Sequence, residues 1–171
     1  MTCNSKLSLK LRLAGALTVI ALTGLDQLIK HFVDAYLKGR PAVTVIKNVL
    51  QLNYLENDGA MMGFMGGRTG LMTVLSLVCI TVMLAVIFSG LVKDRFDYWC
   101  CVLIAAGGTG NIIDRLLRGY VIEYIEVLFV DFYIFNFADC LITVAAFLLI
   151  FYQLYLIYRD SKTKKQVTAD D

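Results

Sequence analysis

The chain has 171 residues, of which 58% are apolar and 18% are charged, and its formal net charge is +2. Its mean hydropathy is +0.70, and its apolar content exceeds the roughly 45–50% found in soluble domains. This composition excludes an ordinary soluble domain, and the small net charge gives no sign of a nucleic-acid partner. The chain is therefore expected to be an integral membrane protein.

Four stretches are apolar and long enough to approach the ~20 helical residues that cross a hydrocarbon core. They run over Leu11–Ile29, Leu71–Val92, Tyr98–Ile113 and Ile134–Tyr158. A cleaved signal peptide is the alternative for the first stretch, but no small-residue cleavage site follows it. The sequence thus predicts a single membrane domain over residues 1–171, with four transmembrane helices.

The distribution of basic residues predicts the orientation in the membrane. Such residues lie before or at the start of the first stretch and after the last: Lys6, Lys10, Arg12, Arg159, Lys162, Lys164 and Lys165. Because segments rich in Lys and Arg stay in the cytoplasm, both termini are expected there. Residues 30–70 and 114–133 then form the outer segments. Residues 161–171 are expected to be a flexible cytoplasmic tail.

Both outer segments contain β-strand patterns. Residues from Pro41 to Leu55 alternate in part between apolar and polar side chains. The stretch from Tyr120 to Phe135 is rich in Val, Ile, Tyr and Phe, which favour strands. We expect the two regions to pair in a small sheet over the outer mouth of the helices.

Acidic residues stand at the ends of the apolar stretches, where a carboxylate is costly and is usually functional. Asp139 lies at the head of the last stretch, in Phe135-Asn136-Phe137-Ala138-Asp139. Asp114 and Glu123 precede it in the second outer segment. The predicted topology places all three acids at the outer face of the membrane.

Further polar residues are predicted on the same side. Asp26 and Lys30 are four residues apart, so they share one face of the first helix. Asn111 and Arg115 follow Gly107-Gly108-Thr109-Gly110, small residues of the kind that let membrane helices pack closely. The outer side gains further amides and turn residues from Asn57, Gly59 and Asn136.

Two carboxyl groups in one low-dielectric site do not easily both ionise, so one is expected to keep a proton. The ionised member can then take a proton from an attacking water, while the protonated member stabilises the oxyanion and later protonates the leaving amine. This is the chemistry of an aspartic peptidase, which needs no metal. The cysteines and the single histidine, His31, lack metal-ligand spacing, so neither a metal nor another cofactor is expected.

The chain resembles the lipoprotein signal peptidases, also called signal peptidase II. Four segments are similar to that family's boxes and come in the same order: Leu25-Asp26-Gln27 with Lys30, Asn57-Asp58-Gly59-Ala60, Gly107 to Arg115, and Phe135 to Asp139. The resemblance implies an all-α membrane protein with four transmembrane helices, a small extracytoplasmic β-sheet and a short outer helix.

The resemblance also implies an activity and a location. The protein would be an aspartyl endopeptidase of the bacterial cytoplasmic (inner) membrane, with its active site near the outer face. It would remove the signal peptide of diacylglyceryl-modified prolipoproteins by cutting just before the lipidated cysteine. Its expected partners are these prolipoproteins and membrane lipids, and its expected state is a monomer.

Carried over by residue, the resemblance makes Asp139 catalytic. The family's other catalytic aspartate aligns with Glu123, so this sequence has a glutamate where the family has aspartate. Asp114 matches a different acid, which is expected to support the site, and it remains an alternative partner for Asp139. Supporting or substrate-binding roles are expected for Asn57, Gly59, Asn111, Asp114, Arg115, Asn136, Asp26 and Lys30.

Several functional interpretations stay open. A displacement of about 1 Å can cost a catalytic group roughly a hundredfold in rate, and a glutamate carboxyl is one methylene farther from the backbone. The protein could therefore cut with Glu123, cut with Asp114, or bind lipoproteins without cutting them. A proton- or ion-coupled transporter is the remaining alternative, although the acids gather at one face instead of crossing the bilayer.

Overall fold

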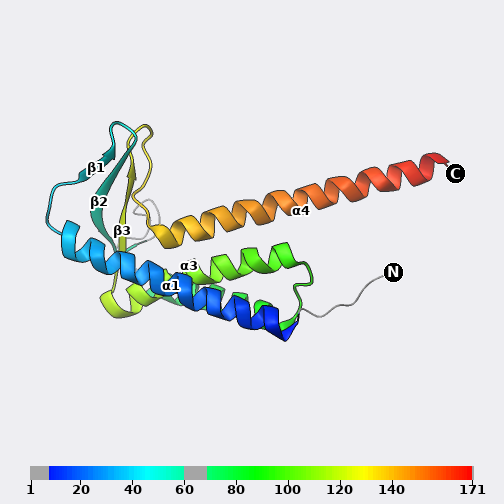
Figure 1. The fold of residues 1–171 in the computed structure, drawn as a ribbon, viewed down its shortest axis with the longest axis horizontal. Helices are drawn as coiled ribbons and strands as arrows, with labels where there is room; N and C mark the ends of the chain where they lie inside the picture. The colour runs from blue at the N-terminus through cyan, green and yellow to red at the C-terminus, as the bar shows by residue number, and fades with distance from the viewer. Residues whose placement is uncertain (1–7, 60–68, 171) are drawn as a thin grey trace.

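The computed structural model describes residues 8–59 and 69–170 and contains four helices and a three-stranded sheet in these ranges. The elements follow in the order α1 (Leu9–Leu37), β1 (Val43–Ile46), β2 (Leu50–Asn57), α2 (Thr69–Ser89), α3 (Arg95–Arg118), β3 (Val121–Val127) and α4 (Phe137–Asp170). In Figure 1 the helices run along the long axis and the sheet stands at one end. The start of α1 and the end of α4 lie at the opposite end.

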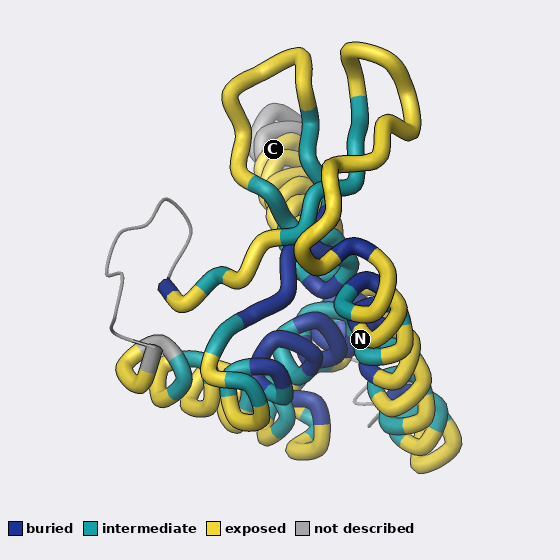
Figure 2. Tube along the Cα trace, turned by 90° about the vertical axis from the view of Figure 1, so that its left-hand side faces the viewer, coloured by how far each residue is buried: buried dark blue, intermediate teal, exposed yellow. Residues whose placement is uncertain are grey.

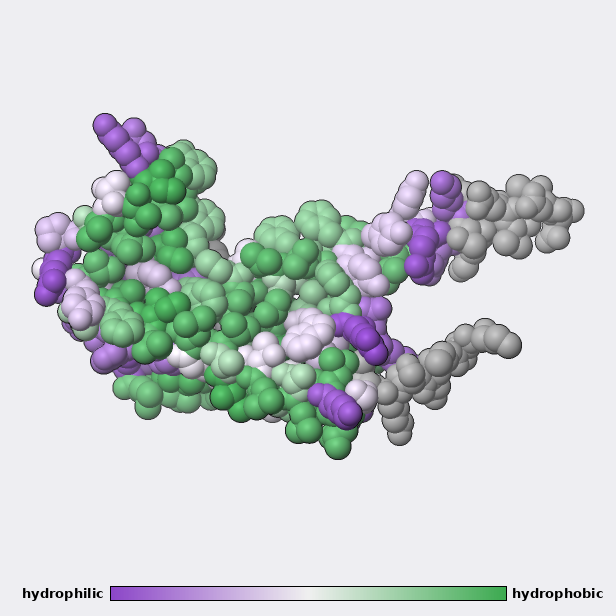
Figure 3. Space-filling model, viewed as in Figure 1, coloured by the Kyte–Doolittle hydropathy of each residue, from purple (hydrophilic) through white to green (hydrophobic). Residues whose placement is uncertain are grey.

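Three of the helices, α1, α3 and α4, are long and apolar enough to cross a membrane. The described apolar part of α2, Thr73–Ser89, is shorter than this criterion requires. The membrane character is thus supported, whereas a fourth crossing remains a proposal. Figure 3 shows the apolar side chains covering the helices and the more hydrophilic residues gathered toward the two ends of the molecule.

Helix ends differ from the predicted spans because local capping decides them. Helix α3 begins after Asp94, whose Oδ1 accepts hydrogen bonds from the backbone N–H groups of Phe96 (2.7 Å) and Asp97 (3.2 Å). It ends at Arg118 and is capped by Gly119, which has the left-handed φ of 81° that favours glycine. The predicted third span ends at Ile113, whereas helix α3 includes Asp114 and continues to Arg118.

The last helix also differs from the prediction at both ends. Residues 134–136 precede the helix, and Phe135 forms an isolated bridge with Ile125 of β3. At the other end α4 continues to Asp170, although a flexible tail was expected from residue 161. Neither glycine nor proline occurs in this part of the chain, so nothing in it interrupts the helix.

The sheet has the order β1-β2-β3, and both pairs are antiparallel. The predicted pairing of the two outer segments is confirmed, with Leu52 opposite Ile125 and Leu55 opposite Glu123. An irregularity in the register lies between Leu52 and Leu55. The expected short outer helix is not among the described elements, and residues 60–68 of this outer segment lie outside the described residues.

Helix α3 packs against the other three helices and is the most buried of the candidate spans (Figure 2). Its glycines allow this close approach. A Cβ atom on Gly107 would collide with the carbonyl of Ala138 on α4, and one on Gly110 would collide with the Asp26 carboxylate on α1. The small residues therefore bring the polar ends of α1, α3 and α4 together.

Candidate active site

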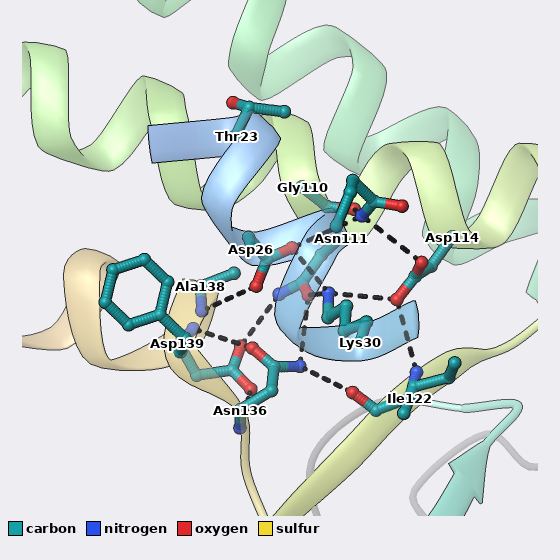
Figure 4. A network of polar contacts seen from close by, with 12 residues as sticks. Thr23, Asp26, Lys30, Gly110, Asn111, Asp114, Ile122, Asn136, Ala138 and Asp139 are labelled. Carbon is teal, nitrogen blue, oxygen red and sulfur yellow. Dashed lines mark hydrogen bonds and ion pairs between the residues drawn. The ribbon is translucent and has the colours of Figure 1, made fainter. Parts of the chain in front are cut away.

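A buried ion triplet forms the base of the site (Figure 4). The Nζ atom of Lys30 lies 2.9 Å from Asp26 Oδ2 and 2.9 Å from Asp114 Oδ2, and all three side chains are fully buried. The predicted i,i+4 relation between Asp26 and Lys30 is confirmed. Because an unpaired charge at this depth would be very costly, each member depends on the others.

The main contacts of Asp114 connect two helices and a strand. Besides Lys30, it accepts a hydrogen bond from the backbone N–H of Ile122 on β3 (3.2 Å) and pairs with Arg118 (3.4 Å). Gln27 on α1 donates to Asp114 Oδ1 at 3.3 Å. These contacts connect α1, α3 and the start of β3, so the carboxylate is fully engaged in holding the sheet on the helices.

Asn111 connects the triplet with Asp139. Its Oδ1 accepts hydrogen bonds from Lys30 Nζ (2.9 Å) and Asn136 Nδ2 (3.1 Å). Its Nδ2 donates to Asp139 Oδ1 at 2.8 Å. Figure 4 shows these side chains converging from α1, α3 and the start of α4. The orientation of the Asn111 amide is therefore defined on both sides.

Asp139 belongs to a capping box at the start of α4. The side chain of Asn136 accepts from the backbone N–H of Asp139 (3.0 Å), and the Asp139 carboxylate accepts from the backbone N–H of Asn136 (3.1 Å). The next two free N–H groups are also satisfied, since Phe137 donates to the Tyr124 hydroxyl and Ala138 donates to Asp26. The sequence Asn-x-x-Asp could have indicated this box.

Glu123 approaches from β3 and is only 8% exposed. Asn57, at the end of β2, donates from Nδ2 to Glu123 Oε1 at 2.6 Å, while its own Oδ1 accepts from the Gly59 N–H. Burial raises the pKa of Glu123 to about 7, and the nearby negative charge of Asp139 adds to this. The hydrogen bond from Asn57 opposes the rise.

Glu123 and Asp139 line the same pocket, whose volume is about 640 Å³. Its polar lining includes Asn57, Asn111 and Arg115. Apolar and aromatic side chains make up much of the remaining wall, among them Leu55, Val121, Phe132, Tyr133, Ile134, Phe135 and Val144. The pocket thus combines Glu123 and Asp139, with Glu56 and Asp58 as further acids, in a largely apolar lining.

The structure divides the predicted site residues into two groups. Asp139, Glu123, Asn57, Asn111 and Arg115 line the pocket, whereas four others lie buried behind it: Asp26, Lys30, Asp114 and Asn136. Gly59 is buried and orients Asn57 through its N–H.

Sequence reasoning did not single out three of the contributing residues. Gln27 and Tyr124 make hydrogen bonds in the network, and Cys140 lines the pocket directly after Asp139. Cys140 could have been suspected from its place in the first turn of α4. In the part of the chain that the structure describes, no group of three or more His, Cys, Asp or Glu side chains is arranged to hold a metal ion.

The fold and the site together describe a helical membrane protein in which two carboxyl groups, those of Glu123 and Asp139, line one pocket. The model of the signal peptidase (SPase) II family matches residues 18–155. The chain belongs to this family. Membership of this family makes it a peptidase, and its long apolar helices are those of a membrane protein.

Individual relatives agree with this membership. The lipoprotein signal peptidase of Streptococcus thermophilus (strain CNRZ 1066) is 34% identical over 139 residues, covering 81% of this chain and 91% of the relative. That of Clostridioides difficile (strain 630) is 31% identical, covering 86% and 97%. A solved structure described as a bacterial membrane enzyme matches with a TM-score of 0.74 and 26% identity, covering 83% and 88% of the two chains.

Proposed function

We propose that this protein is an intramembrane aspartic endopeptidase that removes the signal peptide of diacylglyceryl-modified prolipoproteins, cutting just before the lipidated cysteine. The observation that carries the proposal is that Glu123 and Asp139 face one pocket from two different elements. Membership of the signal peptidase II family supplies the substrate class.

The catalytic pair in this proposal is Glu123 with Asp139. Both line the pocket, and the charge of Asp139 acts on Glu123. Asp114 is less suited to the role, because its carboxylate is buried against Lys30 and Arg118 and does not line the pocket. One member of the pair takes a proton from water, and the other donates a proton to the carbonyl oxygen of the scissile bond.

The surrounding residues would position the substrate. Asn57 and Arg115 are polar groups at the pocket wall that can bind backbone carbonyls of the signal peptide. The apolar wall near Phe132 and Val144 suits the acyl chains and apolar residues that such a substrate carries. Asn111 and Asn136 support the carboxylate of Asp139 from behind.

The proposed placement in the membrane has four crossings, both termini in the cytoplasm, and the pocket near the outer face of the bacterial inner membrane. The basic residues before and at the start of α1 and in the last part of α4 support this orientation. The sheet end of the molecule carries the pocket, opposite the end where α4 finishes. The protein is proposed to act as a monomer among membrane lipids, without a nucleic-acid partner.

The proposed function predicts cleavage by the purified protein in detergent. A diacylglyceryl-modified prolipoprotein should be cut immediately before the lipidated cysteine, as measured by gel shift and by mass spectrometry of the products. The same prolipoprotein without the diacylglyceryl group is the control and should be cut poorly. An intact lipidated substrate after long incubation would contradict the proposal and favour a lipoprotein-binding role, while proton flux in liposomes without peptide would favour transport.

The pair should also show a characteristic dependence on pH. A pair that shares one proton stops working when this proton is lost. Because the pKa of Glu123 is raised to about 7, its protonated fraction falls as the pH rises through that value. Cleavage is therefore expected to decline above about pH 7.

Replacing Asn57 by alanine tests this dependence. The hydrogen bond from Asn57 lowers the pKa of Glu123, so Asn57→Ala should shift the alkaline decline of cleavage to higher pH. The maximal rate should fall about tenfold, as expected for a loss of ~1.4 kcal/mol in the transition state. The matched control is Asn53→Ala, because Asn53 makes the equivalent hydrogen bond to Glu126 outside the pocket (2.8 Å). An unchanged pH profile for Asn57→Ala would contradict the assignment.

A further inference from the structure

We propose that Asp139 is the ionised member of the pair, that Glu123 carries its proton, and that Lys30 is a positioning residue that fixes this arrangement through Asn111. The catalytic consequence rests on the proposed function, whereas the protonation states themselves do not. Two steps lead from the buried ion triplet to Asp139 (Figure 4), and two more concern Glu123.

The first step is the orientation of the Asn111 amide. The ammonium group of Lys30 can only donate hydrogen bonds, so the atom that faces it at 2.9 Å must be the oxygen of Asn111. Asn136 donates to the same oxygen at 3.1 Å. The NH₂ group of Asn111 is thereby directed at Asp139, 2.8 Å away. A flipped amide would place donors against donors.

The second step is the state of Asp139. One carboxylate oxygen accepts from Asn111, and the other accepts from the backbone N–H of Asn136 at 3.1 Å. Both oxygens are thus engaged as acceptors, which favours the charged form. Asp139 also lies in the first turn of α4, where the helix dipole stabilises a negative charge. All these contacts would weaken if Asp139 held the proton.

The third step is the state of Glu123. Asn57 must present its NH₂ group, because its oxygen already accepts from the Gly59 N–H at 2.9 Å. This donor occupies Oε1 of Glu123, and among the described residues no hydrogen-bond donor reaches Oε2. The proton can therefore reside on Oε2. Burial of Glu123 makes this neutral form the less costly one.

The fourth step is the balance of charges around Glu123. The negative charge of Asp139 on α4 favours a protonated Glu123, while Arg115 on α3 and Lys30 on α1 favour an ionised one. Glu56 on β2 and Asp58, which follows β2, are further acids at the pocket wall. The positive charge of Lys30 is already compensated by two carboxylates, each 2.9 Å away. The dominant influence is burial, which favours the neutral form of Glu123.

The assignment gives each carboxyl group a defined part in hydrolysis. Asp139 removes a proton from water as the water oxygen bonds to the carbonyl carbon, and Glu123 gives its proton to the carbonyl oxygen. When the carbon–nitrogen bond then breaks, the proton on Asp139 passes to the leaving amine. The proton of the hydroxyl that becomes the new carbonyl returns to Glu123, so both groups regain their starting states.

NMR of isotope-labelled carboxyl carbons tests the assignment in the full-length wild-type protein in detergent. The Glu123 and Asp139 signals are identified by their loss in Glu123→Gln and Asp139→Asn. In a pH titration Glu123 should stay protonated to a higher pH than Asp139. The reverse order would overturn the proposal. No substrate is involved, so this result stands apart from whether the protein cleaves prolipoproteins.

The role of the Lys30–Asn111 connection needs variants at Asn111, because removing Lys30 would leave two buried acids uncompensated. Asn111→Asp replaces the donor to Asp139 by a carboxylate and should raise the Asp139 titration midpoint by about one pH unit or more. Asn111→Ala removes the donor without adding charge and should raise it less. A merely structural role would leave this midpoint unchanged.

Asn53→Asp is the matched control, since it makes the same replacement on β2 outside the pocket and should leave the Asp139 midpoint unchanged. Thermal unfolding in detergent identifies variants that fail to fold. An unchanged Asp139 midpoint in a folded Asn111 variant would overturn the positioning role, and if neither variant folds, the wild-type titration still decides the proton assignment.

Discussion

Replacing Asp139 by asparagine is expected to lower the rate of prolipoprotein cleavage by about 10²- to 10⁴-fold, the range typical of lost acid–base catalysis. An amide of nearly the same size cannot take a proton from water. Its oxygen can still accept a hydrogen bond from Asn111 or from the backbone of Asn136, so the start of α4 should remain folded. Initial rates of cleavage at saturating substrate measure the effect.

Asp160→Asn provides the matched control for this experiment. Asp160 is an exposed acid on the same helix, where it pairs with Arg159 at 3.2 Å. The replacement removes one negative charge from α4 without touching the pocket, and cleavage should stay near the wild-type rate. Full activity of Asp139→Asn, with the substrate cut at the same bond, would rule out Asp139 as a member of the catalytic pair.

The sheet shows how far the sequence could predict the fold. Both outer segments carried strand-forming residues, and their pairing follows because the spans on either side bring them to the same end of the molecule. Their register could not be predicted, since the irregularity between Leu52 and Leu55 depends on contacts between the strands. This register places Leu55 opposite Glu123 and Asn57 opposite Val121, so it also determines which amide meets the acid.

Asp114 shows a feature of the fold that hydropathy alone does not predict. The apolar run ends at Ile113, so hydropathy predicts that the span ends there. Helix α3 nevertheless continues, and Lys30 and Arg118 satisfy the charge of Asp114 at full burial. Arg118 lies four residues farther along α3, a spacing that the sequence shows, but the closer partner is Lys30 on α1, at 2.9 Å. Sequence spacing on α3 does not reveal this second partner.

The polar residues around Asp139 were predicted as a group, but not as a connected network. Composition and topology collected Asn111, Asn136 and Lys30 on one side of the membrane. Their individual roles depend on which atom faces which, and this follows from the tertiary contacts at 2.8–3.1 Å. The one local part of the network is the capping box of Asn136 and Asp139, which four residues of sequence suffice to define.

Replacing Glu123 by glutamine should have an effect of similar size, lowering cleavage by about 10²- to 10⁴-fold, because an amide cannot supply the shared proton. Asn57 can keep its hydrogen bond to the amide oxygen, so the local structure should survive. Glu126→Gln is the matched control. Glu126 lies on the same strand and accepts from Gln51 and Asn53, but it does not line the pocket, and its loss should leave cleavage nearly unchanged.

Glu123→Asp separates the chemistry of the acid from its position. The shorter side chain can still hold a proton, but its carboxyl is withdrawn by about 1 Å from the 2.6 Å contact with Asn57, so the cleavage rate is expected to fall on the order of a hundredfold.

Asp114→Asn should instead lower the free energy of unfolding, because breaking a buried ion pair costs about 3–5 kcal/mol. If Glu123→Gln kept full activity while a folded Asp114→Asn lost it, Asp114 would be the partner of Asp139. If Glu123 is catalytically active, the positions of Asn57 and of strand β3 must suit the longer side chain of glutamate.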